Sequence, residues 1–423
     1  MWIKGGRILD ASGRTDVFGD IHIEGEKIAG IYPGGTNNAA GEIIDAKGLW
    51  VIPGLIDMHV HLRDPGYEHK EDLMSGSLAA ASGGVSTVLC MANTHPVNDN
   101  PSVTNYIVEK AKTIGLVRIL PTGAATRGLA GKDLVDIAAM KRSGVAAVSD
   151  DGMAIQDSAV LEGALQEAFR YGLPLISHCQ DRSLSGHGVM NEGALSRELG
   201  LEGIPKAAED AMVKRDVELA EKIGKPIHIT HIATMRSLEI ISEAKDRGVG
   251  ITCDVTPHHL LLTQESIRGH GTNAKMYPPL RDEVDRMALI EGLRTSVIDC
   301  IASDHAPHAR HEKALDFKDA PFGMLGLQTL LPAILKIHVD YQIDILNLLA
   351  CVTINPARIL HIEGGTLQPG ERADITIVDP NQAWTFNKHH IVSKSTNSAF
   401  IGATFPGKVI FTIARGRIIY SQN

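Results

Sequence analysis

Eight short apolar runs alternate with polar, helix-forming stretches across the middle of the chain, and this alternation limits the choice of fold most. Parallel strands that are buried on both faces read as continuous apolar runs, and βα units repeat strand and helix in this order. Eight such units in about 300 residues predict a TIM (β/α)8 barrel. Helices are expected at 159–171, 208–223 and 235–246, and the eight runs are 49–56, 87–92, 117–120, 145–148, 173–177, 226–230, 250–253 and 298–303.

A doubly wound parallel sheet is the alternative α/β fold. It is disfavoured because no glycine-rich phosphate loop follows the first run.

The two chain ends have a different pattern from the middle. Residues 1–50 contain short alternating strands, at 3–9, 20–24, 27–31 and 42–45, with glycine- and asparagine-rich breaks at 34–35 and 37–38. Residues 365–423 also contain alternating strands. We expect residues 1–50 plus 365–423 to form one composite β-sandwich domain, and residues 51–364 to form the barrel.

Composition restricts the class of partner. The net charge of −9 argues against nucleic acid or an acidic membrane as the main partner. The five cysteines are scattered without a CxxC motif, which is typical of reduced thiols in the cytoplasm. No signal peptide and no apolar run of membrane-spanning length is evident. We therefore expect a cytoplasmic protein that acts on a small molecule.

A histidine pair follows the first apolar run. Side chains alternate between the faces of a strand, so His59 and His61 point the same way and can bind one metal ion. Arg63 follows two residues later, where it can hold an anionic substrate. The pair alone leaves a metal site and a hydrogen-bonded surface pair equally open.

Similar polar residues follow other runs of the predicted barrel. Active sites of such barrels are built at the carboxyl ends of the strands. Four imidazoles and two carboxylates at one rim suit two divalent metal ions, with zinc the leading choice. Two metal ions can share a hydroxide, and a carboxylate on the eighth strand can carry its proton to a leaving nitrogen, as in hydrolysis of an amide-like carbon or its reverse. The residues after the fourth, fifth, sixth and eighth runs are Asp150, Asp151, His178, His231, Asp304 and His305.

Taken together, these motifs resemble the amidohydrolase superfamily and, within it, the bacterial class I dihydroorotases. The similarity extends over nearly the whole chain. It is carried by DMHVHLRDPG (57–66), CMANT (90–94), VSDDG (148–152), ISHC (176–179), ITHI (229–232), TPHHL (256–260), PPLR (278–281), ASDHAPH (302–308), PFG (321–323) and LQPGERAD (367–374).

The resemblance implies a reaction and a role for each residue. The reaction is the metal-dependent, reversible cyclisation of N-carbamoyl-L-aspartate to L-dihydroorotate in de novo pyrimidine biosynthesis, through a hydroxide that bridges two Zn²⁺ ions. The implied metal ligands are His59, His61 and Asp304 for one ion, His178 and His231 for the other, and Asp151 for both; Asp304 is also the general acid/base. The implied substrate-binding residues are Arg63, Asn93, Tyr277, His308, Phe322 and Gly323.

Two positions distinguish this chain from relatives. Many members of the superfamily bridge their metals with a carboxylated lysine, but 148–152 contains no lysine, which argues against a hydantoinase or allantoinase. Asp150 is then expected to support its neighbour Asp151 rather than bind metal.

Tyr277 stands where the family usually has asparagine, and a phenol cannot reproduce the hydrogen bonds of an amide. Asn273 is one candidate to replace it, but a tolerated exchange is the favoured interpretation.

Several alternatives stay open. Another cyclic amidase is one, and a non-catalytic partner of aspartate transcarbamoylase is another, although such a protein should lack some of the six ligands. A homodimer is compatible with each of these functions.

Two further expectations concern the residues after the eighth run. His305 is expected to orient its neighbours, and segment 308–319 is expected to be a lid that orders when substrate binds.

Overall fold

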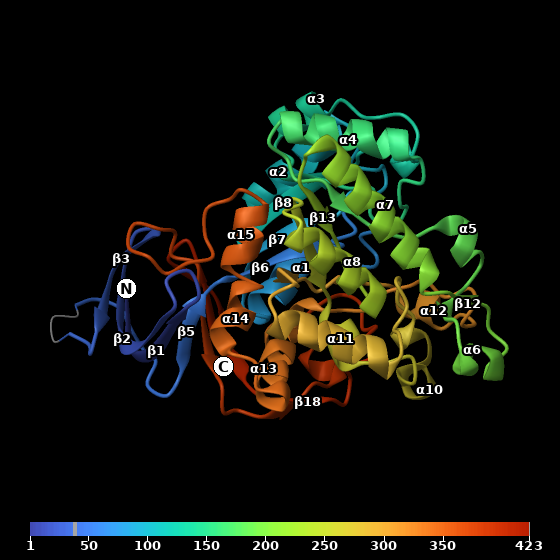
Figure 1. Ribbon diagram of the computed structural model, residues 1–423. Helices are drawn as coiled ribbons and strands as arrows, with labels where there is room; N and C mark the ends of the chain where they lie inside the picture. The colour runs from blue at the N-terminus through green and yellow to red at the C-terminus, as the bar shows by residue number, and fades with distance from the viewer. Residues whose placement is uncertain (37–39, 423) are drawn as a thin grey trace.

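The computed structural model describes residues 1–36 and 40–422, so the predicted break at 37–38 lies outside the described residues (Figure 1). Each of the eight predicted runs contains or adjoins a parallel strand. The strands are β6 (Leu55–Val60), β7 (Val85–Cys90), β8 (Arg118–Gly123), β9 (Ala147–Val148), β10 (Ile176–Ser177), β13 (Ile227–Ile229), β14 (Ile251–Val255) and β15 (Cys300–Ile301).

These strands close into a barrel. They pair in the orders β6-β7-β8-β9 and β10-β13-β14-β15. A parallel bridge from Val148 to Leu175 joins the two groups at one side, and a bridge from Val60 to His305 joins them at the other. The predicted TIM barrel is therefore confirmed.

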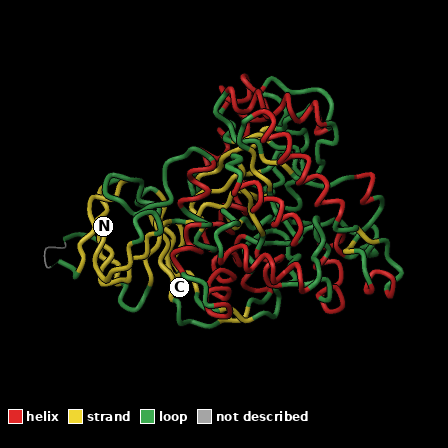
Figure 2. Tube along the Cα trace, viewed as in Figure 1, coloured by secondary structure: helices red, strands yellow, loops and turns green. Residues whose placement is uncertain are grey.

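Helices surround the strands on the outside of the barrel (Figure 2). The three predicted helices are present, and each begins or ends at a recognisable signal. Asp157 caps the first turn of α4 by accepting from Ala159 N at 2.7 Å, and Gly224 ends α7 with φ of +63°. The helices are α1 (Leu73–Ser82), α2 (Pro101–Ile114), α3 (Ile137–Ser143), α4 (Ser158–Arg170), α5 (Arg182–Ser185), α6 (Ala194–Glu198), α7 (Ala207–Ile223), α8 (Met235–Asp246), α9 (Pro257–Leu261), α10 (Ser266–His270), α11 (Glu283–Arg294), α12 (Arg310–Lys313), α13 (Leu330–Tyr341), α14 (Ile345–Ala350) and α15 (Ile354–Ile359). None of the described helices has both the length and the hydropathy needed to cross a bilayer.

Both chain ends meet in one sheet beside the barrel (Figure 1). The order is β20-β19-β16-β5-β1-β2-β3, with β4 also paired to β1. β5 is parallel to β1 and antiparallel to β16, so it joins the amino-terminal strands to the carboxyl-terminal ones. The strands are β1 (Trp2–Asp10), β2 (Thr15–Glu24), β3 (Lys27–Pro33), β4 (Ile43–Asp45), β5 (Trp50–Pro53), β16 (Ile375–Asp379), β19 (Lys408–Ala414) and β20 (Arg417–Ser421).

The run 49–56 is two strands rather than the single barrel strand that we predicted. β5 belongs to the composite sheet and β6 to the barrel, with Gly54 between them. A Cβ on Gly54 would lie 2.4 Å from Ser86 Oγ, so only glycine fits where the chain crosses between the sheets. We propose that the composite domain extends to Pro53.

The segment 380–407 leaves the composite sheet and packs on the barrel. β17 (Trp384–Thr385) pairs with β18 (Thr404–Phe405), and Phe386 and Phe400 pack with Met276 and Ala333 in one buried cluster. This return to the barrel was not predicted. A further short pair, β11 (Met190–Asn191) with β12 (Gly203–Ile204), lies in the loop after β10.

Candidate metal centre and substrate pocket

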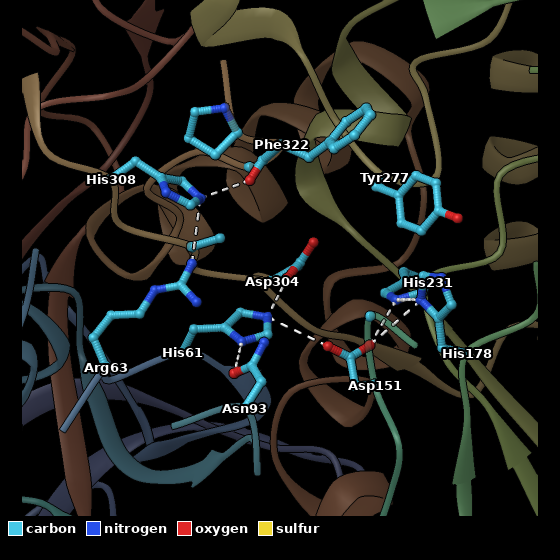
Figure 3. Close-up of a pocket in the computed structure, with 14 residues that line it drawn as sticks. His61, Arg63, Asn93, Asp151, His178, His231, Tyr277, Asp304, His308 and Phe322 are labelled. Atoms are coloured by element: carbon cyan, nitrogen blue, oxygen red, sulfur yellow. Dashed lines mark hydrogen bonds and ion pairs between the residues drawn. The ribbon is translucent and has the colours of Figure 1, made fainter. Parts of the chain in front are cut away.

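The six predicted metal ligands converge at the carboxyl ends of the barrel strands, and Figure 3 shows all of them except His59. Three residues at this rim, Arg63, His231 and Asp304, have positive φ angles of 61°, 39° and 45°. Such conformations are uncommon outside glycine and are retained where the surroundings fix them, often at functional sites. His59 lies in β6 and His61 just beyond it, while Asp151, His178, His231 and Asp304 follow β9, β10, β13 and β15.

Asp151 lies between two pairs of histidines. Its Oδ2 is 3.3 Å from His59 Nε2 and 3.6 Å from His61 Nε2. Its Oδ1 is 3.3 Å from His231 Nε2 and 3.5 Å from His178 Nδ1. One carboxylate oxygen therefore faces each pair, which is the arrangement that a bridging ligand requires.

The donor atoms fit metal binding. His59, His61 and Asp151 form one group, and Asp151, His178 and His231 form a second, with the ligand atoms of each group within 4.8 Å of one another. His59 Nε2 is buried and makes no hydrogen bond within the described residues. Buried polar atoms normally have partners, and imidazole nitrogens gathered on a carboxylate suit a divalent cation.

Asp304 joins the first group by one oxygen only. Its Oδ1 is 3.0 Å from His61 Nε2 and 3.6 Å from His59 Nε2. The other oxygen points away from His61 (Figure 3). Burial raises the pKa of Asp304, but the neighbouring histidines outweigh it and hold the pKa below its ordinary value. Burial also raises the pKa of Asp151, and the neighbouring histidines again outweigh it and hold the pKa well below its ordinary value. Both carboxylates are therefore ionised at neutral pH.

Two side chains fix the orientation of the first histidine pair. His59 Nδ1 is 2.8 Å from Thr230 Oγ1, and His61 Nδ1 is 2.9 Å from Asn93 Oδ1. An amide oxygen can only accept, so Nδ1 of His61 carries a proton, and Nε2, which faces Asp304, is the nitrogen that could bind metal. Asn93 was predicted only for substrate binding, and Thr230 was not predicted at all.

Thr230→Val should weaken metal binding by about 10- to 100-fold, because the hydrogen bond that orients His59 is lost. Competition with a chelator measures the change. Thr122→Val is the matched control, since the Thr122 hydroxyl is also buried but has no partner within the described chain. Equal affinities in the two variants would contradict the assigned role of Thr230.

Two further residues support the site as predicted. Asp150 accepts from the backbone N–H groups of Ala125 and Thr126 at 2.8 and 3.0 Å, so it braces the turn before Asp151. His305 Nδ1 accepts from Gly326 N at 3.1 Å, so this nitrogen is not available to bind a metal ion.

Asp254 is a supporting residue that sequence reasoning missed. Its Oδ1 accepts from His231 N at 2.7 Å, and its Oδ2 is 2.9 Å from His228 Nε2. The bond to His231 holds this ligand in its positive-φ conformation. A carboxylate directly after the seventh apolar run, 250–253, was the available signal.

A cavity of about 300 Å³ is lined by the predicted metal ligands other than His59. Arg63 donates from Nε to Pro307 O at 3.2 Å, and its Nη2 is 3.3 Å from His308 Nε2. Within the described residues, no carboxylate lies within 4.0 Å of this guanidinium, and burial lowers its pKa only to about 10. It therefore presents an unpaired positive charge to an anion. All six predicted substrate residues line the cavity: Arg63, Asn93, Tyr277, His308, Phe322 and Gly323.

Tyr277 forms an aromatic wall of this cavity. Its ring stacks on His178 at 5.1 Å between centroids and lies 5.0 Å from the ring of Phe322. Asn273, the candidate replacement for the amide, lines a different hollow. The structure thus brings Tyr277 to the site but not Asn273.

The backbone groups of Phe322 and Gly323, which border the cavity, differ in whether they already have hydrogen-bond partners. Gly323 donates its N–H to Lys275 O at 2.8 Å, and its carbonyl accepts from Lys313 and Asn397. The Phe322 carbonyl accepts from His308 Nε2 at 2.7 Å, whereas its N–H has no partner among the described residues. Phe322, rather than Gly323, therefore retains a backbone donor for a ligand. Asn397, from segment 380–407, had no sequence signal.

Relatives identify the family. The family model described as Dihydro-orotase-like matches residues 48–237. The chain is 48% identical to a dihydroorotase of Geobacter metallireducens and 46% identical to one of Aquifex aeolicus, each over 99% of both chains. The chain belongs to the dihydroorotase family. It is accordingly a metal-dependent hydrolase of cyclic amides.

Solved structures support the fold. The L-hydantoinase (dihydropyrimidinase) of Arthrobacter aurescens superposes with a TM-score of 0.87 at 24% identity, covering 100% of this chain and 96% of that one. A D-hydantoinase from Thermus sp. gives 0.84 at 23% identity, covering 99% and 94%. At this identity the likeness shows the barrel and composite domain, and the hydantoinase alternative rests on fold alone.

Proposed function

We propose that the protein interconverts N-carbamoyl-L-aspartate and L-dihydroorotate as a step of de novo pyrimidine biosynthesis. One observation carries the proposal. The unpaired guanidinium of Arg63 lines the same cavity as Asp151 and histidines of both ligand groups, namely His61, His178 and His231. A substrate that places a carboxylate at one end and an amide-like carbon at the other would satisfy both.

The proposal includes two divalent ions, with zinc the leading choice because histidine and carboxylate donors suit it. When bound, the ions would lower the pKa of a shared water and polarise the carbonyl of the scissile amide. The proposed ligands are His59, His61 and Asp304 for one ion, His178 and His231 for the other, and Asp151 for both.

Asp304 is the proposed general acid/base. Its Oδ1 is taken by the histidines, and its other oxygen is free to accept a proton from the attacking water. The same oxygen then delivers that proton to the ring nitrogen as the C–N bond breaks. In the direction of cyclisation, Asp304 removes the proton from the attacking ureido nitrogen and returns it to the oxygen that leaves as water when the C–O bond breaks.

The remaining pocket residues bind and orient the substrate. Arg63 can contact both oxygens of a carboxylate, and a guanidinium does so with matched geometry. The Asn93 amide nitrogen and His308 border the same space. The Phe322 N–H supplies a donor, and Tyr277 and Phe322 cover the ring of the substrate with aromatic surface.

Turnover of dihydroorotate, hydantoin and allantoin by one sample tests this function. We expect hydrolysis of dihydroorotate to dominate, because only this substrate carries the carboxylate that Arg63 requires. Turnover of hydantoin or allantoin without dihydroorotate would overturn the proposal.

The proposal extends to location and assembly. We place the enzyme in the cytoplasm, as a homodimer that associates with aspartate transcarbamoylase. The support is the resemblance to class I dihydroorotases and the five buried thiols without a disulfide among the described residues. Sedimentation of the protein with and without the transcarbamoylase tests both associations.

A further inference from the structure

Two buried lysines hold the segment 317–323, which carries one wall of the substrate cavity. Lys275 is only 2% exposed. Its Nζ donates to the carbonyls of Phe317, Lys318 and Ala320 at 2.6, 2.9 and 2.7 Å. An ammonium has three donors, so these three carbonyls satisfy it completely.

Lys313 binds the rest of the same segment. It is 8% exposed and donates from Nζ to the carbonyls of Pro321 and Gly323 at 2.8 and 3.0 Å. Within the described residues, the hydrogen bonds of both ammonium groups all go to backbone carbonyls. Burying a charge without a counter-ion is costly, and backbone carbonyls are what replaces its water here. Such a cage requires the segment to keep one conformation.

Lys275 also contacts the wall directly. Its Nζ is 4.5 Å from the centre of the Phe322 ring, a cation–π distance. Its carbonyl accepts from Gly323 N at 2.8 Å. Phe322 in turn accepts from His308 Nε2 at 2.7 Å. Lys275 therefore fixes the side chain of Phe322, the backbone of Gly323 and, through them, His308, although it does not line the cavity itself.

We propose that Lys275, assisted by Lys313, is a positioning residue for substrate binding in this enzyme. The ammonium sets the position of Phe322 and Gly323 against the substrate and has no part in the chemistry at the metal centre. This inference rests on the proposed function, because it assigns the segment's contacts to that substrate.

Lys275→Met keeps much of the side-chain volume and removes the charge and donors. We expect KM for dihydroorotate to rise about tenfold or more, with kcat changed less and metal content equal to that of the unaltered enzyme. Lys318→Met is the matched control, because Lys318 lies in the same segment with an exposed side chain, and its kinetics should be unchanged. A KM for Lys275→Met within twofold of the unaltered value, or a parallel loss of metal, would overturn the proposal.

Proteolysis gives a readout without substrate. Trypsin should cut after the exposed Lys318 slowly in the unaltered protein and several-fold faster in Lys275→Met, and Lys318→Met identifies the cut by abolishing it. Equal rates would overturn the positioning role. If the unaltered enzyme failed to turn over dihydroorotate, the proposed function would fail, while this arm would still test how Lys275 holds the segment.

The unaltered protein supplies a second test if Lys275→Met does not fold. Burial lowers the pKa of Lys275 to about 8, against the opposing charge of Asp319. Burial and Lys275 together lower the pKa of Lys313 to about 7, against Glu312. Raising the pH from 7 to 9 removes these protons, so KM and the rate of cleavage after Lys318, corrected for trypsin's own pH profile, should both rise. If neither KM nor the rate of cleavage changed with pH, the proposal that the two lysines hold segment 317–323 would be contradicted.

Discussion

Asp304→Asn should retain its metal and lose turnover by about 10²- to 10⁴-fold, the contribution typical of a positioned general acid or base. The amide keeps an oxygen where Oδ1 now faces His61 at 3.0 Å, but it cannot take up and release a proton. Metal content and kcat for dihydroorotate, measured on the same preparation, check this result.

His178→Ala is the comparison for the Asp304 variant. His178 Nδ1 is 3.5 Å from Asp151 Oδ1, and His178 takes no part in the proposed proton transfer. We expect this variant to lose metal and activity together. If Asp304→Asn lost as much metal as His178→Ala, Asp304 would be mainly a ligand and its role as proton carrier would be wrong.

Arg63→Met should lower kcat/KM for dihydroorotate by roughly 30- to 5,000-fold. Truncating one partner of a buried, hydrogen-bonded charge pair costs about 2–5 kcal/mol, and each 1.4 kcal/mol is about tenfold. The substrate carboxylate would then meet only neutral donors, because burial, the largest cause, still lowers the pKa of His308 when the cation of Arg63 is gone. Steady-state kinetics on dihydroorotate give the ratio.

Dihydrouracil, which lacks the carboxylate, is the matched substrate for Arg63→Met. The unaltered enzyme should prefer dihydroorotate strongly, and the variant should lose most of that preference. Arg182→Met serves as a matched variant, because the exposed Arg182 lines a neighbouring cavity that Tyr277 also borders. An Arg63 variant that slowed both substrates equally would show that Arg63 maintains the structure of the site rather than selecting the carboxylate.

Much of the site could be predicted because barrel geometry determines where strand ends go. His59, His178 and Asp304 are far apart in sequence, yet each follows an apolar run, and parallel strands in a barrel bring these ends to one rim. The resemblance then added roles that position alone does not give. Asn93 and His308 are examples, since only the resemblance assigned them to the substrate.

The remainder depended on contacts that no local pattern records. Gly54 separates two strands within one apolar run, and only the packing of Ser86 against it reveals the crossing. Asn397 reaches the barrel mouth from a segment that pattern alone assigned to the composite domain, and its Nδ2 donates to Ala306 O at 3.0 Å. Lys275 is buried because distant carbonyls converge on it, whereas sequence position alone would place a lysine at the surface.

Metal content and turnover of dihydroorotate on one purified sample, before chelation, after chelation and after adding metal back, test the central claim most directly. We expect two divalent ions per chain, loss of turnover with their removal and recovery with zinc. Full turnover in the metal-free protein, or a metal-loaded protein that leaves dihydroorotate unchanged, would contradict it.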